Sequence, residues 1–228
     1  MNRLRRSGRL LAVLAVPFLA AACSDDDDAV TGPGEVGIAQ VRVVHLSPDA
    51  PAVDVAVNGE VAVAGAAYLD ATGYLPVPAG DVRITVTPAG QSSPVVIDAT
   101  VPLGADASYT IAATGLLADI QPLVLLDNRS PNGQAKVRFV HTSPDAPEVS
   151  VAVTDGPVIF GGVAFRAATQ YAEVDGGTYD LEVRLAGTST VALPLPGVDL
   201  AGGTNYTVFA TGLASDGSLG ALPLVDAP

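Results

Sequence analysis

The chain has 228 residues, 49% of them hydrophobic, which is enough for two domains of about 100 residues with apolar cores. Its 24 glycines and 18 prolines stay below the share that is typical of a disordered chain. A formal net charge of −13 excludes nucleic acid and anionic membrane surfaces as electrostatic partners.

Residues 1–22 have the features of a signal peptide. Four arginines lie within the first nine residues, and the apolar run Leu10–Ala22 that follows is too short to span a bilayer. The run ends in L-A-A-A-C, which resembles a bacterial lipoprotein signal. This resemblance implies that cleavage exposes Cys23 and that its sulfur carries a diacylglycerol. Ordinary cleavage after Ala22 is the alternative, and it would leave a soluble secreted protein.

We prefer lipidation because Cys23 is the only cysteine in the chain, and a lone thiol in an exported protein otherwise lacks an explanation. The protein is then exported and anchored to the cell membrane or the outer membrane, facing the periplasm or the exterior. In an organism with two membranes, Ser24, the residue after the cysteine, favours the outer membrane by resemblance to lipoprotein sorting rules.

Residues 23–37 are expected to form an acidic flexible tether. The run Asp25–Asp28 resembles a cation site, but four adjacent like charges are more typical of a solvated, self-repelling segment. All 24 acidic residues lie beyond Cys23, against seven basic ones, so the exported chain has a net charge of −17.

A duplication dominates the remaining sequence. Residues 41–57 read V-R-V-V-H-L-S-P-D-A-P-A-V-D-V-A-V, and residues 137–153 repeat 13 of these 17 positions at an offset of 96. The first five residues favour a strand, S-P-D-A-P has turn chemistry, and the valines that follow alternate with other residues. Because both copies keep the whole turn, we expect its side chains to fix the register between the first two strands.

Each copy contains roughly seven short strands separated by turns, and we find no amphipathic helix in the chain beyond the signal. The sequence therefore predicts an all-β fold of two tandem immunoglobulin-like antiparallel β-sandwich domains. The first spans residues 38–128, a linker 129–133, and the second 134–228. In the first domain, strands are expected at Val41–His45, Val53–Val57, Val61–Tyr68, Tyr74–Val77, Val82–Val86, Val95–Val101, Ser108–Ala113 and Leu123–Leu126.

Two tyrosines occupy matching positions late in each copy. Tyr109 and Tyr206 each open a strand after a glycine-bearing segment. This arrangement resembles the tyrosine corner of immunoglobulin-like domains, in which the hydroxyl bonds to backbone upstream. The chain has no tryptophan and no disulfide, so an antibody-type core is excluded.

The signature V-R-x-x-H-x-S-P-D-A-P, present twice behind a lipoprotein signal, resembles a bacterial exported family classed as a domain of unknown function. The resemblance covers nearly all of residues 38–228. It implies an extracytoplasmic protein of tandem immunoglobulin-like units without an established activity, and it supplies no catalytic residues.

The turns contain the only two histidines of the chain, and these turns are the candidate site: His45, Ser47 and Asp49 in the first copy, and His141, Ser143 and Asp145 in the second. A catalytic triad needs serine and aspartate on opposite nitrogens of one imidazole, whereas here they flank a single proline. We therefore expect structural histidines bonded within the turn. A weak metal or small-ligand site, or a hydrolase, is the alternative.

No sequence motif of a hydrolase, metalloprotease, P-loop or EF-hand is present, and we expect no enzyme activity, no cofactor and no metal. Carbohydrate binding usually relies on aromatic platforms, for which only Tyr68 is a candidate. We predict a non-catalytic interaction or structural module of the cell envelope. Its partners would be the membrane, through Cys23, and an unknown envelope protein or polysaccharide.

Overall fold

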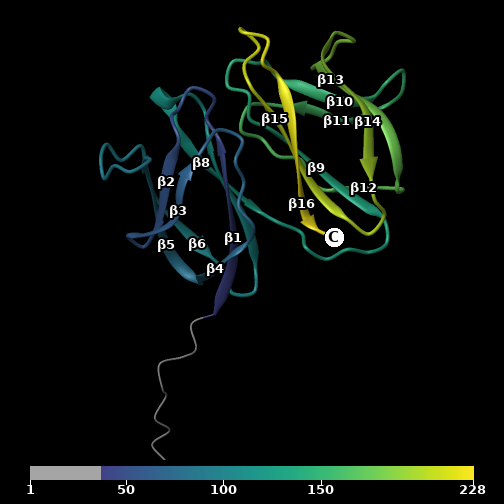
Figure 1. The fold of residues 1–228 in the computed structure, drawn as a ribbon. Helices are drawn as coiled ribbons and strands as arrows, with labels where there is room; N and C mark the ends of the chain where they lie inside the picture. Colours follow the sequence, from purple (N-terminus) through teal and green to yellow (C-terminus); the bar gives the residue numbers. More distant parts are fainter. Residues whose placement is uncertain (1–36) are drawn as a thin grey trace, which may run out of the picture. The chain divides into compact units, whose positions relative to one another are not determined.

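The computed structural model describes residues 37–228, so the predicted signal peptide, Cys23 and most of the predicted acidic tether lie outside the described residues. The described part contains strands and one short 3₁₀ helix, η1 (Leu117–Asp119) (Figure 1). Within it, no helix is long and apolar enough to cross a membrane.

Repeat 1 has eight strands, and every strand expected from the sequence is found, the second with the expected bounds and the others with one or both ends shifted. They are β1 (Ile38–Leu46), β2 (Val53–Val57), β3 (Glu60–Ala66), β4 (Leu75–Pro78), β5 (Gly80–Pro88), β6 (Ile97–Leu103), β7 (Ser108–Thr114) and β8 (Gln121–Leu126). Repeat 2 has the same order: β9 (Ala135–His141), β10 (Val149–Val153), β11 (Val158–Val163), β12 (Ala172–Val174), β13 (Gly177–Leu185), β14 (Val191–Leu200), β15 (Asn205–Thr211) and β16 (Gly220–Ala227).

Each repeat is a sandwich of two four-stranded sheets. In repeat 1 the sheets have the orders β4-β1-β7-β8 and β3-β2-β5-β6, and in repeat 2 the orders β12-β9-β15-β16 and β11-β10-β13-β14. The predicted all-β fold of tandem β-sandwiches is confirmed.

The pairing of the first strand differs from the immunoglobulin arrangement. In an immunoglobulin constant domain the first two strands share a sheet, whereas here β1 and β2 belong to opposite sheets. One pair per repeat is parallel, β1 with β7 and β9 with β15, and the other pairs are antiparallel. The S-P-D-A-P turn therefore carries the chain from one sheet to the other, and the expectation that it sets the register of two paired strands is wrong.

The first strand of each repeat is buried on both faces, which explains its nearly continuous apolar sequence. Val41 and Val43 point into the core of repeat 1, together with residues of β2, β5, β6 and β7. Val44 and Leu46 point the other way, into a separate apolar cluster with Val140 and Phe209 of repeat 2. The outer face of β1 thus packs against the neighbouring repeat and not against water.

Candidate functional site

The two S-P-D-A-P turns hold their histidines by backbone contacts. His45 is almost completely buried, its Nδ1 accepts a hydrogen bond from the N–H of Ser47 at 3.3 Å, and its Nε2 lies 3.1 Å from the carbonyl oxygen of Pro51. Because one nitrogen accepts and the other must donate, the ring is neutral with its hydrogen on Nε2. His141 repeats this geometry with Ser143 and Pro147, at 3.4 Å and 3.0 Å.

The aspartate of each turn caps a distant loop. Asp49 accepts a hydrogen bond from the N–H of Leu117 at 2.7 Å, and its Oδ1 also lies 3.5 Å from the hydroxyl of Ser47. Asp145 accepts from the N–H groups of Ala214 and Ser215 at 2.7 and 2.9 Å. Each turn therefore links the crossing between the sheets to the loop that precedes the last strand of its repeat.

The charge states of these groups suit a structural role. Burial lowers the pKa of His45, against the opposing effects of its bond to Pro51 and the negative charge of Asp70. Burial likewise lowers the pKa of His141. Hydrogen bonds from Ser215 and Ala214 lower the pKa of Asp145, because they stabilise the carboxylate.

A serine–histidine–aspartate relay cannot operate in this arrangement. Both ring nitrogens of His45 are engaged by backbone groups, and the Ser47 hydroxyl bonds to Asp49 instead of to the imidazole. Across residues 37–228, no group of three or more His, Cys, Asp or Glu side chains is placed to hold a metal ion.

The two corner tyrosines bond to backbone upstream. The hydroxyl of Tyr109 accepts a hydrogen bond from the N–H of Gly104 at 3.0 Å, and that of Tyr206 accepts from the N–H of Ala201 at 3.1 Å. Each bond spans five residues and closes the loop that leads into β7 or β15.

The most elaborate polar constellation joins the two repeats. Arg42, the arginine of V-R-V-V-H, extends from the outer face of β1 and donates from Nη2 to Oδ1 of Asp226 in repeat 2 at 2.5 Å. Its Nε and Nη2 also donate to the hydroxyl of Thr110, and its Nη1 donates to the carbonyl oxygen of Val225. The Asp226 side chain has no exposed surface, so this is a buried ion pair.

The second arginine makes the reciprocal contact. Arg138 donates from Nη2 to Oδ1 of Asp127 at 2.5 Å, to the hydroxyl of Thr207 and to the carbonyl oxygen of Leu126. The arginine of each repeat is therefore paired with the aspartate that ends the last strand of the other. The charges of these two arginines and two aspartates balance one another.

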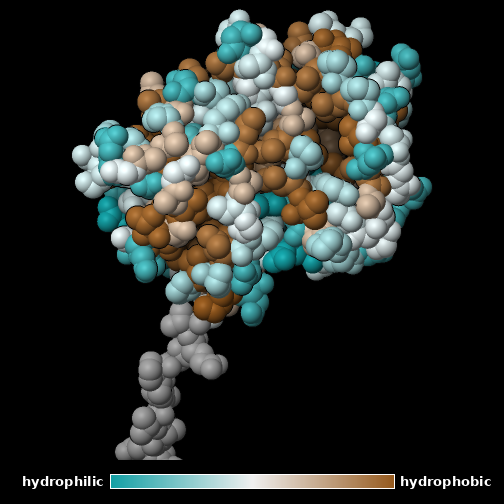
Figure 2. All heavy atoms as spheres, viewed as in Figure 1, coloured by the Kyte–Doolittle hydropathy of each residue, from teal (hydrophilic) through white to brown (hydrophobic). Residues whose placement is uncertain are grey.

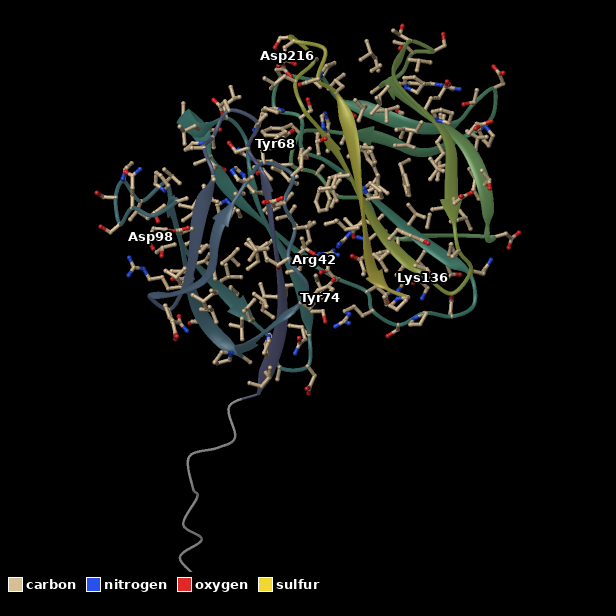
Figure 3. All side chains as sticks on the ribbon, in the orientation of Figure 1. Arg42, Tyr68, Tyr74, Asp98, Lys136 and Asp216 are labelled. Carbon is tan, nitrogen blue, oxygen red and sulfur yellow. The ribbon has the colours of Figure 1, made fainter. Side chains whose placement is uncertain are left out.

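Two tyrosines complete this cluster. The hydroxyls of Tyr74 and Tyr171 donate to Asp127 and Asp226 at 2.8 and 2.7 Å. The guanidinium of Arg42 lies 4.9 Å from the ring centre of Tyr74 (Figure 3), and that of Arg138 lies 4.7 Å from Tyr171. Burial, followed by the charge of Asp127, raises the pKa of Tyr74 well above its usual value, so the phenol stays a donor. We call Arg42, Arg138, Asp127, Asp226, Thr110, Thr207, Tyr74 and Tyr171 the crossed cluster.

Contacts at the far end of the interface extend this connection. The hydroxyl of Tyr68 accepts a hydrogen bond from the N–H of Gly212 at 2.8 Å, and its ring packs edge-on against His45. Tyr68 is therefore a bridge between the repeats and not the exposed platform that the sequence suggested. In return, Arg166 of repeat 2 donates to Thr114 and Asp119 of repeat 1.

Sequence reasoning missed the crossed cluster, although it left a signal. Arg42 and Arg138 are identical residues at the same position of two mostly apolar strands, in a chain with only 11 basic residues. Asp127 directly follows β8 and Asp226 is the next-to-last residue of β16, and each comes after two apolar residues, in L-L-D and L-V-D. A buried charge at a repeated position requires a partner, but only the fold shows that the partner lies in the other repeat.

Comparison with known proteins identifies the family. The chain belongs to the family described as "Domain of unknown function (DUF4397)", whose model matches it twice, at residues 39–152 and 152–228. No curated protein matches the chain significantly.

Two solved structures are among those similar to the chain. The C-terminal domain of AlgF from P. aeruginosa is 21% identical, with 41% of this chain and 99% of that one covered and a TM-score of 0.33. The family CBM26 domain CBMbc from Eubacterium rectale Amy13K, in complex with maltoheptaose, is 10% identical, with 83% and 98% covered and a TM-score of 0.28. Neither likeness is close enough to bear on the function of this chain.

Proposed function

We propose that this protein is a lipid-anchored, non-catalytic module of the cell envelope that presents two fused sandwiches as a single rigid body. Cys23 is the anchor, and residues 24–37 connect it to repeat 1. The partner is an envelope protein or polysaccharide that binds the exposed loops.

The observation that carries this proposal is the crossed cluster. Two buried salt bridges, each with neutral donors around it, require one relative arrangement of the repeats, because any rotation would leave a buried charge without its partner. Loops carried on both repeats are then held at fixed separations, which lowers the entropy lost when a partner binds both. Such rigidity suits a binding or spacing role.

Charge supports the same role. The segment from Cys23 onward has seven basic and 24 acidic residues, so an anionic membrane surface repels it. The acidic tether therefore keeps the folded part away from the bilayer to which the lipid holds it, and leaves its surface free for other partners.

Two experiments test the proposal. Metabolic labelling with a radioactive fatty acid should mark the wild type and not Cys23→Ser, and equal labelling of both, or none in either, would refute the anchor. In intact cells, crosslinking should capture the same partner with wild type and with the turn variants Asp49→Ala and Asp145→Ala. A turn variant that melts like the wild type yet loses the partner would place the binding site in the turn.

A pair of variants tests whether the partner requires the fixed arrangement of the two repeats. Where both variants are folded and present at the wild-type level, loss of the crossed cluster in Arg42→Met should weaken capture of the partner, whereas Arg83→Met, which removes the exposed salt bridge to Asp98, should leave it unchanged. Equal capture by both variants would show that rigidity is not what the partner requires.

A further inference from the structure

Repeat 2 contains an apolar cavity between its two sheets. The cavity has a volume of about 240 Å³ and is lined by fifteen residues, to which each of the eight strands of the repeat contributes. Fourteen of them are apolar, and the fifteenth, Tyr179, donates its hydroxyl to the carbonyl oxygen of Asp175. Figure 2 shows a hollow with hydrophobic side chains between β16 and β14.

The corresponding space in repeat 1 is occupied by packed side chains. Val82, Ile84 and Val101 of repeat 1 are at most 5% exposed. Their counterparts by strand register are Tyr179, Leu181 and Val198, all of which are partly exposed because they face the cavity. The two repeats share one topology, but they differ in this cavity, which repeat 2 has and repeat 1 fills with side chains.

β14, the edge strand of the sheet that contains β13, is irregular and leaves an opening to the cavity. β14 contains Pro194, Pro196 and Gly197, and its register with β13 shifts between Tyr179 and Leu181. Gly197 has a φ of +67°, and its N–H donates to Asp180 at 2.8 Å, so the bulge is held by a specific bond. In repeat 1 the edge strands β6 and β8 contact each other, whereas β14 and β16 pack less closely.

One substitution between the repeats enlarges the space further. Ala172 pairs with Val137 in β12, at the position where Leu75 pairs with Val41 in β4. The leucine of repeat 1 is replaced by a residue three carbon atoms smaller, and Ala172 lines the cavity.

We propose that this cavity binds one unbranched hydrocarbon chain. Its lining offers no free polar group, and a buried water needs two to four polar partners, so an apolar ligand is favoured over water. Since a 150 Å³ cavity accommodates the six carbons of benzene, 240 Å³ corresponds to about ten carbons.

The shape of the space favours a chain over a ring system. The lining crosses four strands of each sheet, and three inter-strand spacings of about 4.8 Å give a length of about 14 Å. The volume divided by this length leaves a cross-section of about 17 Å², which is enough for one extended hydrocarbon chain and too small for two side by side. The polar end of the ligand remains in solvent, at the opening between β14 and β16. Binding of a hydrocarbon chain in this cavity does not depend on the envelope protein or polysaccharide proposed as a partner above.

Titration of the chain from residue 23 onward, without the predicted signal peptide, with Cys23→Ser and purified without detergent, tests the proposal. Decanoate should bind and raise the unfolding temperature, and butyrate at the same concentration should not. Flotation with vesicles of zwitterionic phosphatidylcholine distinguishes the source of the chain, because co-flotation indicates capture of a lipid acyl chain and its absence indicates a free fatty acid. Failure of decanoate to bind, together with no co-flotation, would overturn the proposal.

Filling the cavity provides the matched variants. Ala172→Leu and Ala221→Leu each take up space equal to about three methylenes, so each should weaken decanoate binding by about tenfold or more. Ala62→Leu, the same change on the exposed side of β3, should leave binding unchanged. Circular dichroism checks folding, and if one of the two cavity variants does not fold, the other decides the test. Undiminished binding by a folded, cavity-filled variant would also overturn the proposal.

Discussion

Replacing Arg42 with methionine should destabilise the whole folded unit. The side chain is 4% exposed, so its removal leaves the carboxylate of Asp226 buried and without a cation. Asp226 would keep only the neutral donors Thr207 and Tyr171, because Arg138 is engaged with Asp127.

The expected size of the effect follows from these contacts. Arg42 donates to one carboxylate, one hydroxyl and one carbonyl, and methionine fills much of its volume without replacing any of these bonds. Breaking one side of a buried ion pair typically costs about 3–5 kcal/mol. We expect a loss of about 4 kcal/mol in the free energy of unfolding, which is a large part of the total for a typical domain, about 5–15 kcal/mol.

Urea denaturation of the Cys23→Ser chain measures this loss. Adding Asp226→Asn to Arg42→Met should recover about 2 kcal/mol or more, because the orphaned charge disappears while an acceptor for Tyr171 remains. Arg83→Met is the control, since Arg83 and Asp98 form a salt bridge on the surface with both side chains about half exposed. Its midpoint should stay close to that of the wild type.

Two results would contradict this reasoning. An Arg42→Met midpoint equal to that of Arg83→Met would mean that the crossed cluster contributes nothing to stability. Arg42 lies 4.0 Å from Asp127 but 2.5 Å from Asp226, so a double-mutant cycle should give stronger coupling to Asp226. Equal coupling to both aspartates would contradict the exchange of partners between repeats.

Three further outcomes are expected. Tyr109→Phe and Tyr206→Phe should each lower the free energy of unfolding of the full chain by about 1–2 kcal/mol, the loss of one hydrogen bond, and an unchanged urea midpoint in both would argue against a corner. Asp49→Ala and Asp145→Ala should each cost about 1–2 kcal/mol in the same assay, because the loop N–H groups lose their acceptor. Stability should fall as the pH drops from 7 toward 5: the folded pKa of each turn histidine lies below the unfolded value of about 6.5, so the unfolded chain binds protons first. Thermal unfolding against pH measures this, and a flat profile, or one unaltered by replacing both histidines with glutamine, would be inconsistent with it.

Much of the fold could be predicted because the relevant patterns are local. Alternating valines at 53, 55 and 57 predict β2, and Asn58-Gly59 predicts the hairpin to β3, where both residues have positive φ. The 96-residue offset predicts that one sandwich repeats the other. These signals depend on neighbours in the sequence, and the structure preserves them.

Contacts between distant residues could not be predicted in this way. Arg42 and Asp226 are 184 residues apart, and no sequence pattern near either residue indicates that the other is its partner. The parallel partners in β1 and β7 are 68 residues apart, so the sequence favours a turn between paired strands where the chain in fact crosses from one sheet to the other. The cavity accompanies a bulge in β14, whereas its lining residues look like ordinary core positions in the sequence.

The reciprocal salt bridges of the crossed cluster have the geometry of a symmetric dimer. Repeat 1 by itself carries both an arginine and an aspartate of the cluster, Arg42 and Asp127, so two copies of it would form the same two salt bridges across a two-fold axis. Such reciprocity defines an isologous homodimer, and the tandem chain has the architecture of a dimer whose subunits became covalently joined. Once the subunits are joined in one chain, they no longer have to be identical. One repeat can then keep a filled core while the other has a cavity, a difference that a symmetric homodimer cannot have.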